Sequence, residues 1–180
     1  MQRINQLIGH YRTFISLLLA LVILALAKPT LSSIAWGLPF VIIGELIRTW
    51  SAGSINKEYE KLTTWGPYSY TRNPLYIGNF LLGLGFVFMG NQWVTILIFF
   101  IVFFLIYRAT ILDEEKTLIK VFGATFTEYK REVPRFFPRF SPYRKGEQNF
   151  DWKRVVKHRE YNAWMGILAV LVLFCIKLLY

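Results

Sequence analysis

The chain has 180 residues, of which 54% are hydrophobic and 18% are charged, and its mean hydropathy is +0.38. About a quarter of the residues of a soluble domain are charged, so this composition excludes an ordinary soluble domain. The apolar content also excludes a disordered chain, and the single cysteine, Cys175, excludes a disulfide scaffold. His10, His158 and Cys175 lie far apart in the sequence, so we expect no metal site. The composition is that of an integral membrane protein.

Five apolar segments follow one another along the chain, at residues 11–27, 33–50, 75–89, 93–112 and 163–180. At 1.5 Å per residue, segments of this length reach about 22–30 Å, which is close to the thickness of the hydrocarbon core. The third and fourth segments are separated only by Gly90-Asn91-Gln92, which predicts a tight antiparallel hairpin. We therefore predict an all-α integral membrane fold, a single domain over residues 1–180 with five transmembrane helices.

The distribution of Lys and Arg predicts how these segments are oriented. If the N-terminus is cytoplasmic, only Lys28 and Lys177 of the 21 Lys and Arg residues lie outside, which leaves 19 on the inner side. This is a strong positive-inside bias, and it places the C-terminus outside. The net charge of +10 then reflects orientation and contact with anionic headgroups. We expect membrane lipids as partners and no nucleic acid.

Almost all of the polar sequence lies in two cytoplasmic pieces, residues 51–73 and 113–162, and chemistry is expected there. From Leu112 to Val133, apolar side chains recur every three or four residues, as on one face of a helix that continues the fourth segment. Three prolines at four-residue spacing, from Pro134 to Pro142, then prevent a helix. We predict a cytoplasmic amphipathic helix and an extended Pro/Arg-rich segment between helices 4 and 5.

The stretch 66–78 is the most informative part of the smaller piece. Gly66-Pro67 is a turn signal, and Asn73 before Pro74 suits an N-cap followed by the first residue of a helix. Beside Arg72, such a helix start attracts a carboxylate or phosphate. The alternative is a well-capped helix whose tyrosines lie in an interfacial belt, and the residues alone do not separate these interpretations.

Carboxylates gather at the inner end of the fourth segment, where Asp113, Glu114 and Glu115 are consecutive. Cations must offset their repulsion, and Arg108, one to two turns earlier, is a candidate, as is a positively charged ligand. The alternative is a solvated helix face. Glu45 and Arg48 lie three residues apart in the second segment, where a carboxylate is a candidate functional group. We favour the alternative of an isolated ion pair near the interface.

Residues 66–78 resemble the Gly-x-Tyr-x-x-x-Arg-His-Pro-x-Tyr-x-Gly signature of the isoprenylcysteine carboxyl methyltransferase family and its phospholipid methyltransferase relatives. Asn73 stands where the family usually has His. Residues 114–138 are similar to a second motif of the family, and Arg48-Thr49-Trp50 to the end of its second helix. The resemblance covers about residues 45–140. The signature positions that match are Tyr68, Arg72, Pro74, Tyr76 and Gly78.

This resemblance implies an enzyme that uses S-adenosylmethionine as cofactor and methylates a membrane-embedded lipid or prenylated acceptor, on a carboxylate or an amine, at the cytoplasmic face. Small prokaryotic members have five spans, which implies a bacterial inner membrane. Asn73 keeps hydrogen bonding but cannot carry charge or move a proton, which leaves the acceptor open. The implied catalytic residues are Arg108, Glu114 and Glu115. The implied cofactor-binding residues are Tyr68, Arg72, Asn73, Pro74, Tyr76, Gly78 and Glu115.

Two other functions remain open. Membrane reductases of the sterol-reductase type use NADPH and share an Arg-His-Pro-type helix start, although the short chain and its five apolar segments speak against them. A non-catalytic lipid-binding membrane protein would keep the fold without the reaction.

Overall fold

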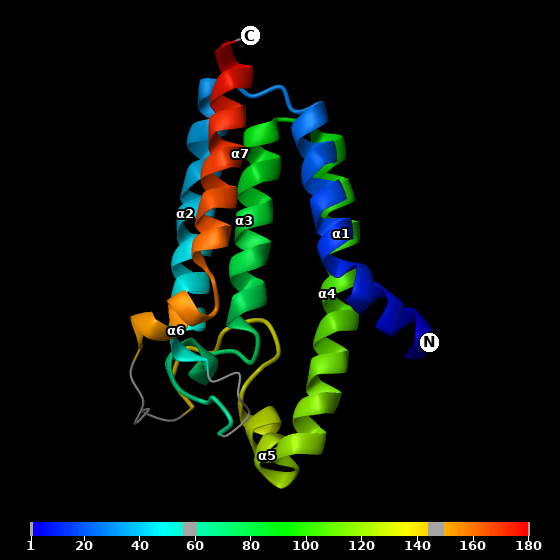
Figure 1. Ribbon diagram of the computed structural model, residues 1–180, viewed down its shortest axis with the longest axis vertical. Helices are drawn as coiled ribbons and strands as arrows, with labels where there is room; N and C mark the ends of the chain where they lie inside the picture. Colours follow the sequence, from blue (N-terminus) through cyan, green and yellow to red (C-terminus); the bar gives the residue numbers. More distant parts are fainter. Residues whose placement is uncertain (1, 56–60, 144–149, 180) are drawn as a thin grey trace.

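The computed structural model describes residues 2–55, 61–143 and 150–179, and every regular element in these ranges is helical. Two helix pairs dominate the molecule, with α2 packed on α3 and α1 packed along α4 (Figure 1). The elements are α1 (Gln2–Leu26), α2 (Leu31–Ser54), the short 3-10 helix η1 (Gly66–Ser69), α3 (Pro74–Gly90), α4 (Trp93–Phe122), α5 (Ala124–Glu132), α6 (Trp152–Lys157) and α7 (Tyr161–Leu179). The predicted all-α class is confirmed for the described residues.

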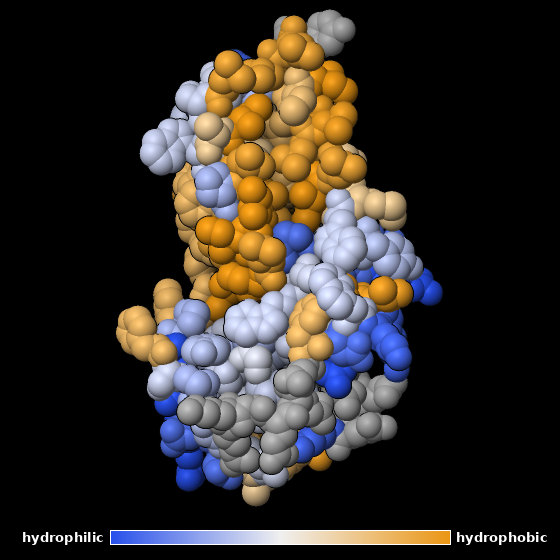
Figure 2. Space-filling view, turned by 90° about the vertical axis from the view of Figure 1, so that its left-hand side faces the viewer, coloured by the Kyte–Doolittle hydropathy of each residue, from blue (hydrophilic) through white to orange (hydrophobic). Residues whose placement is uncertain are grey.

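Among the described residues, three helical stretches are long and apolar enough to cross a membrane: α2, the stretch Trp93–Glu132 that holds α4 and α5, and α7. Phe14–Leu26 of α1 and Pro74–Gly90 of α3 are shorter apolar helices. Apolar surface covers one part of the molecule, and the other end is largely hydrophilic (Figure 2). We call the latter, where α5 and α6 lie (Figure 1), the polar end.

Glycines let α2 and α3 approach until their backbones touch. A Cβ on Gly37 would lie 2.4 Å from the carbonyl oxygen of Gly85, and a Cβ on Gly44 would lie 2.8 Å from that of Gly78. Only hydrogen fits at these positions, as in other close helix contacts within membranes. Gly85 is therefore part of a close contact between the two helices.

The predicted hairpin between the third and fourth segments is confirmed. Helix α3 ends at Gly90 and α4 begins at Trp93, and Asn91 between them adopts a left-handed conformation with φ of 52°. The same end of the molecule is tied by Lys177 of α7, whose Nζ donates to the carbonyl oxygens at the end of α1. These acceptors are Leu24 (2.6 Å), Ala25 (3.1 Å) and Ala27 (3.2 Å).

The sequence predicted that residues 112–133 continue the fourth segment as one helix, and the structure differs from this prediction. Helix α4 continues to Phe122, but Gly123 is left-handed with φ of +51°, and α5 begins only after it. The break turns α5 back toward the rest of the polar end (Figure 1). The apolar pattern nevertheless identified inward-facing side chains, because Phe126, Tyr129 and Val133 form a small buried core with Leu62.

Candidate functional site

A tight turn precedes α3 and fixes the first part of the site. Gly66 has φ of +57°, and a Cβ there would lie 2.8 Å from Oγ of Ser54, so glycine is needed for conformation and for space. The hydroxyl of Ser69 donates to the carbonyl of Gly66 at 2.7 Å and closes η1. Burial raises the pKa of the Tyr68 phenol, so this side chain stays neutral.

The extended segment 134–143 lies against residues 69–73, although about 65 residues separate them in sequence. Backbone hydrogen bonds join the two segments. Since both segments lack regular structure of their own, these bonds satisfy their backbone groups and fix their relative position. The phenol of Tyr129 adds a bond to the carbonyl of Tyr68 at 2.7 Å. The backbone N–H bonds run from Arg72 to Pro134 (2.9 Å), from Arg139 to Tyr70 (2.9 Å) and from Tyr143 to Ser69 (3.0 Å).

Asn73 occupies the N-cap position of α3, and Pro74 is the first helical residue, as predicted. The predicted capping bond is wrong, however, because the Asn73 side chain makes no hydrogen bond to the helix start. Its amide nitrogen instead donates to the carbonyl of Arg135 at 2.8 Å. Asn73 therefore links the start of α3 to the extended segment.

Glu115 of α4 is the centre of an ion-pair cluster. Its carboxylate lies 3.0 Å from Nη1 of Arg72, 2.9 Å from Nη2 of Arg135 and 3.8 Å from Nζ of Lys130. Arg135 binds it with two nitrogens, since its Nε also donates to Oε1 at 3.0 Å. The side chains of Arg72 and Glu115 are 8% and 7% exposed, so solvent screens this pair little. Three cations around one carboxylate leave the cluster with a net positive charge.

The two arginines of this cluster are in different environments. Burial lowers the pKa of the Arg72 guanidinium, and the charge of Glu115 opposes this shift. The hydrogen bond to Glu115 raises the pKa of Arg135. Nε of Arg72 is buried and has no hydrogen-bond partner within the described ranges. A buried N–H without a partner costs free energy, and an anion bound beside it would remove that cost.

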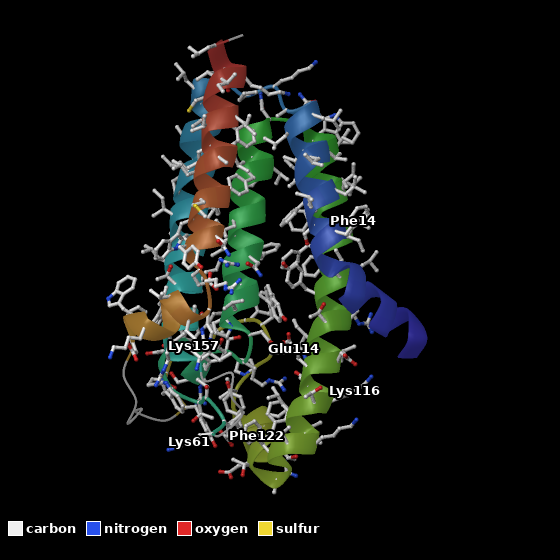
Figure 3. All side chains as sticks on the ribbon, viewed as in Figure 1. Phe14, Lys61, Glu114, Lys116, Phe122 and Lys157 are labelled. Atoms are coloured by element: carbon white, nitrogen blue, oxygen red, sulfur yellow. The ribbon has the colours of Figure 1, made fainter. Side chains whose placement is uncertain are left out.

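A cavity of about 750 Å³, which we call the polar cavity, lies beside the cluster. The hydroxyl of Tyr76 donates to the carboxylate of Glu114 and so joins α3 to α4. Figure 3 shows Glu114 between the lower parts of these helices, whereas Lys116 lies on the other side of α4. The sequence-predicted residues that line the cavity are Tyr68, Arg72, Asn73, Tyr76, Glu114 and Glu115.

A second cavity of about 190 Å³, which we call the apolar cavity, lies among α1, α3, α4 and α7. Ser16, Asn79 and Tyr107 line both cavities, so the two adjoin. Two adjoining cavities of this kind can hold a ligand whose apolar part lies in one cavity and whose polar head group lies in the other. The apolar lining includes Leu82, Phe86, Phe99, Phe103 and Phe174.

Three sequence-predicted residues lie outside both cavities. Gly78 packs on α2, where a Cβ would lie 2.7 Å from the carbonyl oxygen of Gly44. Pro74 is fully buried at the first position of α3. Arg108 is exposed on α4. Gly78 and Pro74 therefore shape the helix contact and the helix start.

A family model described as phospholipid methyltransferase matches residues 15–125, which is more than half of the chain. The match includes the whole stretch 66–78 and both Glu114 and Glu115. The chain belongs to the phospholipid methyltransferase family. The resemblance found in the sequence is thereby confirmed.

Curated relatives of this family member include proteins of bacteria and eukaryotes. The chain is 36% identical over 141 residues to the cobalt-zinc-cadmium resistance protein CzcN of Cupriavidus metallidurans, covering 76% of this chain and 63% of that protein. It is 33% identical over 87 residues to the protein-S-isoprenylcysteine O-methyltransferase of Schizosaccharomyces pombe, covering 48% and 36%. It is 30% identical over 125 residues to the Homo sapiens protein of the same name, covering 61% and 44%.

The chain thus spans less than two thirds of the length of each of these relatives. No solved structure matches it. Across residues 2–55, 61–143 and 150–179, the structure holds no group of three or more His, Cys, Asp or Glu side chains placed to bind a metal ion.

Arg48 and Asn79 are cavity residues that the sequence interpretation missed. The predicted ion pair between Glu45 and Arg48 is present at 3.3 Å. The prediction that it is isolated is wrong, because Arg48 also donates to Glu160 at 2.7 Å and to Asn79. Asn79 follows Tyr76 by three residues and therefore shares its helix face, which was a usable signal. No pattern in the nearby sequence predicted that Glu160 would contact Arg48.

Arg135 and Lys130 were also missed, as partners of Glu115. Arg135 lies inside the second motif, so its position in the sequence already made it a candidate site residue. Its pairing depends on the path of the extended segment, which the sequence did not predict.

Proposed function

We propose that this chain transfers a methyl group from S-adenosylmethionine to a lipid or lipidated acceptor at the cytoplasmic face of a membrane. One observation carries the proposal: the two motifs meet at one cavity, where Arg72 pairs with Glu115 and Tyr76 with Glu114. The isoprenylcysteine O-methyltransferases among the relatives support the reaction class.

The polar cavity suits this donor in size and charge. Ligand pockets are typically about 300–1,000 Å³, and the polar cavity has about 750 Å³. S-adenosylmethionine carries a carboxylate, an ammonium and a sulfonium, so it needs both an anion site and a cation site. Arg72 and Lys61 offer the first and Glu114 the second. The buried Nε of Arg72 gains a partner if the donor carboxylate lies beside it.

We assign Arg72 to the donor carboxylate, and Glu114, bridged to Tyr76, to its positive groups. Glu115 is already bound to three cations, so its part is to hold Arg72 in place. When bound, the donor supplies a methyl group whose bond to sulfur breaks, leaving the electron pair on sulfur, as its bond to the acceptor forms.

The chain itself contributes alignment and exclusion of water, which together lower such a barrier by several kcal/mol. A carboxylate acceptor needs no base. An amine acceptor must first lose a proton, and Glu114 is the carboxylate placed to take it. The part of the acceptor's hydrocarbon chain next to its head group can occupy the apolar cavity, which adjoins the polar one, while the rest of the chain stays in the bilayer.

The proposal includes five membrane-crossing helices, with the N-terminus and the polar end cytoplasmic, as in an inner membrane. In a Cys175→Ser background, Ser141→Cys should react with an impermeant maleimide only from the cytoplasmic side, and Ser32→Cys only from the outer side. Both residues are exposed; Ser32 lies at the start of α2, and Ser141 lies in the extended segment 134–143, which belongs to the polar end (Figure 1). Reaction of Ser141→Cys from outside would contradict this orientation.

Methyl transfer is tested with the purified chain, S-adenosylmethionine labelled in its methyl group, and a total membrane lipid extract resolved by class. Parallel arms offer N-acetyl-S-farnesylcysteine, a carboxylate acceptor, and phosphatidylethanolamine, an amine acceptor. We expect label in one class, and its loss in Arg72→Ala. No label in any arm refutes the proposal. Oxidation of NADPH by the same preparation would then indicate a reductase, and no turnover of either donor a lipid-binding protein.

A further inference from the structure

Asn79 occupies a place that the donor assignment does not explain. It lies on α3 one turn beyond Tyr76, and it lines both the polar and the apolar cavity. An acceptor whose chain fills the apolar cavity and whose head group reaches the donor must pass this point. Asn79 is therefore next to the position where the two substrates meet.

Arg48 of α2 orients the Asn79 side chain. Its Nη1 donates to Oδ1 of Asn79, its Nη2 donates to Glu160 at 2.7 Å, and its Nε lies 3.3 Å from Glu45. The exposed fractions of the three charged side chains are 14% for Arg48, 8% for Glu160 and 18% for Glu45. One guanidinium held by two carboxylates has no positive charge left over for an anionic ligand. Its remaining effect is to fix the amide.

This fixed orientation has a chemical consequence. Because Oδ1 of Asn79 faces Arg48, Nδ2 is the group that remains for a ligand, and it has no hydrogen-bond partner within the described part of the chain. An amide nitrogen only donates hydrogen bonds. It therefore suits an oxygen acceptor on a lipid head group.

We propose that Nδ2 of Asn79 donates a hydrogen bond to an oxygen of the acceptor's head group, close to the atom that is methylated, and that Arg48 is the positioning residue for this bond. The inference rests on the proposed methyl transfer and adds a contact on the acceptor side to it. A prenylcysteine carboxylate and a phospholipid phosphate both offer such an oxygen, and the two acceptor arms distinguish them.

The test measures two quantities in each variant: the Kd for S-adenosylhomocysteine, and the KM for whichever acceptor arm takes label in the wild type. Asn79→Leu removes the amide. Asn79→Asp keeps its shape and an oxygen toward Arg48 but removes the N–H, so it serves if the leucine variant fails to fold. We expect either variant to raise the acceptor KM about tenfold or more and to leave the donor Kd within about twofold.

Arg48→Lys tests the positioning role. It keeps the charge between the carboxylates but not the planar fork that reaches Asn79. We expect it to raise the acceptor KM as well, and the double variant Arg48→Lys/Asn79→Leu to be no worse than Asn79→Leu alone, because both act on one bond. Asn162→Leu, at an exposed asparagine of α7, is the matched control and should change neither constant.

Each outcome has one meaning. An unchanged acceptor KM in Asn79→Leu and Asn79→Asp overturns this inference alone, as does an equal loss of donor affinity, which would place Asn79 in the donor site. Additive effects of Arg48→Lys and Asn79→Leu overturn the positioning role. A wild-type protein that binds no S-adenosylhomocysteine and labels no acceptor refutes the proposed function, and this inference fails with it.

Discussion

The contact between α2 and α3 and the polar cavity are built on opposite principles. Between the helices, backbone meets backbone, and a Cβ on Gly37 would lie 2.4 Å from the carbonyl oxygen of Gly85. Around the cavity, segments far apart in sequence are joined by ion pairs and hydrogen bonds, such as the two bonds from Arg135 to Glu115. The first region has no spare volume, while the second surrounds about 750 Å³.

This difference indicates a division of tasks. Close packing tolerates no added atoms but does not depend on charge, so the contact between α2 and α3 stabilises the fold. Ion pairs and hydrogen bonds place specific groups and leave space between them, so they hold the site. Substitutions in the two regions should consequently fail in different ways, one in folding and the other in binding.

The largest effect is expected in the helix contact. In Gly44→Val, the Cβ would lie 2.8 Å from both the carbonyl oxygen of Gly78 and the amide nitrogen of Leu82. Overpacking against backbone should cost about 3 kcal/mol or more, seen as lost expression or a much lower melting temperature in detergent. Gly166→Ala is the control, since nothing lies within 4 Å of its Cβ. Equal melting of the two variants would show that the close contact does not stabilise the fold.

The next effect is expected at the centre of the ion-pair cluster. Glu115→Gln leaves Arg72 and Arg135 without their carboxylate, so Arg72 loses its fixed position. We expect the affinity for S-adenosylhomocysteine to fall about 10- to 100-fold, measured by calorimetry, with a smaller change in melting than in Gly44→Val. Asp113→Asn, on an exposed residue of the same helix, should bind normally. Full affinity in Glu115→Gln would remove this cluster from the donor site.

The sequence was a good guide to the regular elements and to part of the site. Hydrophobic runs predicted the apolar helices, and Pro74 gave the start of α3, because these signals are local. Which residues face the cavity was harder to predict. Glu160 reaches Arg48 across 112 residues, and Arg135 reaches Glu115 only because the extended segment returns along residues 69–73. Such contacts depend on tertiary path, which local patterns do not contain.

A smaller effect is expected from the bridge between α3 and α4. Tyr76→Phe removes the hydroxyl that donates to Glu114 but keeps the ring, which packs edge-on against Tyr107 at 4.9 Å. Loss of one hydrogen bond to a charged group should weaken S-adenosylhomocysteine binding about three- to tenfold in the same titration. Tyr70→Phe, a neighbour that does not line the cavity, is the control. Equal affinities in both variants would argue against a role for the bridge.

The smallest effect is expected in the pH dependence of stability. Burial raises the pKa of Tyr129, whose hydroxyl donates to the carbonyl of Tyr68. In the unfolded chain a tyrosine loses its proton near pH 10, so the folded form becomes relatively less stable as the pH rises above about 10. Tyr129→Phe should melt slightly lower at neutral pH and lose less stability between about pH 10 and 11, measured by thermal unfolding. Parallel curves for both proteins would contradict this assignment.

Binding of the donor itself tests the central claim most directly. The wild-type protein in detergent is titrated calorimetrically with S-adenosylhomocysteine and, in parallel, with NADPH. If residues 68–78 and the glutamates of α4 form a methyl-donor site, S-adenosylhomocysteine binds at micromolar concentration and NADPH does not. Binding of NADPH alone, or of neither, would contradict the account.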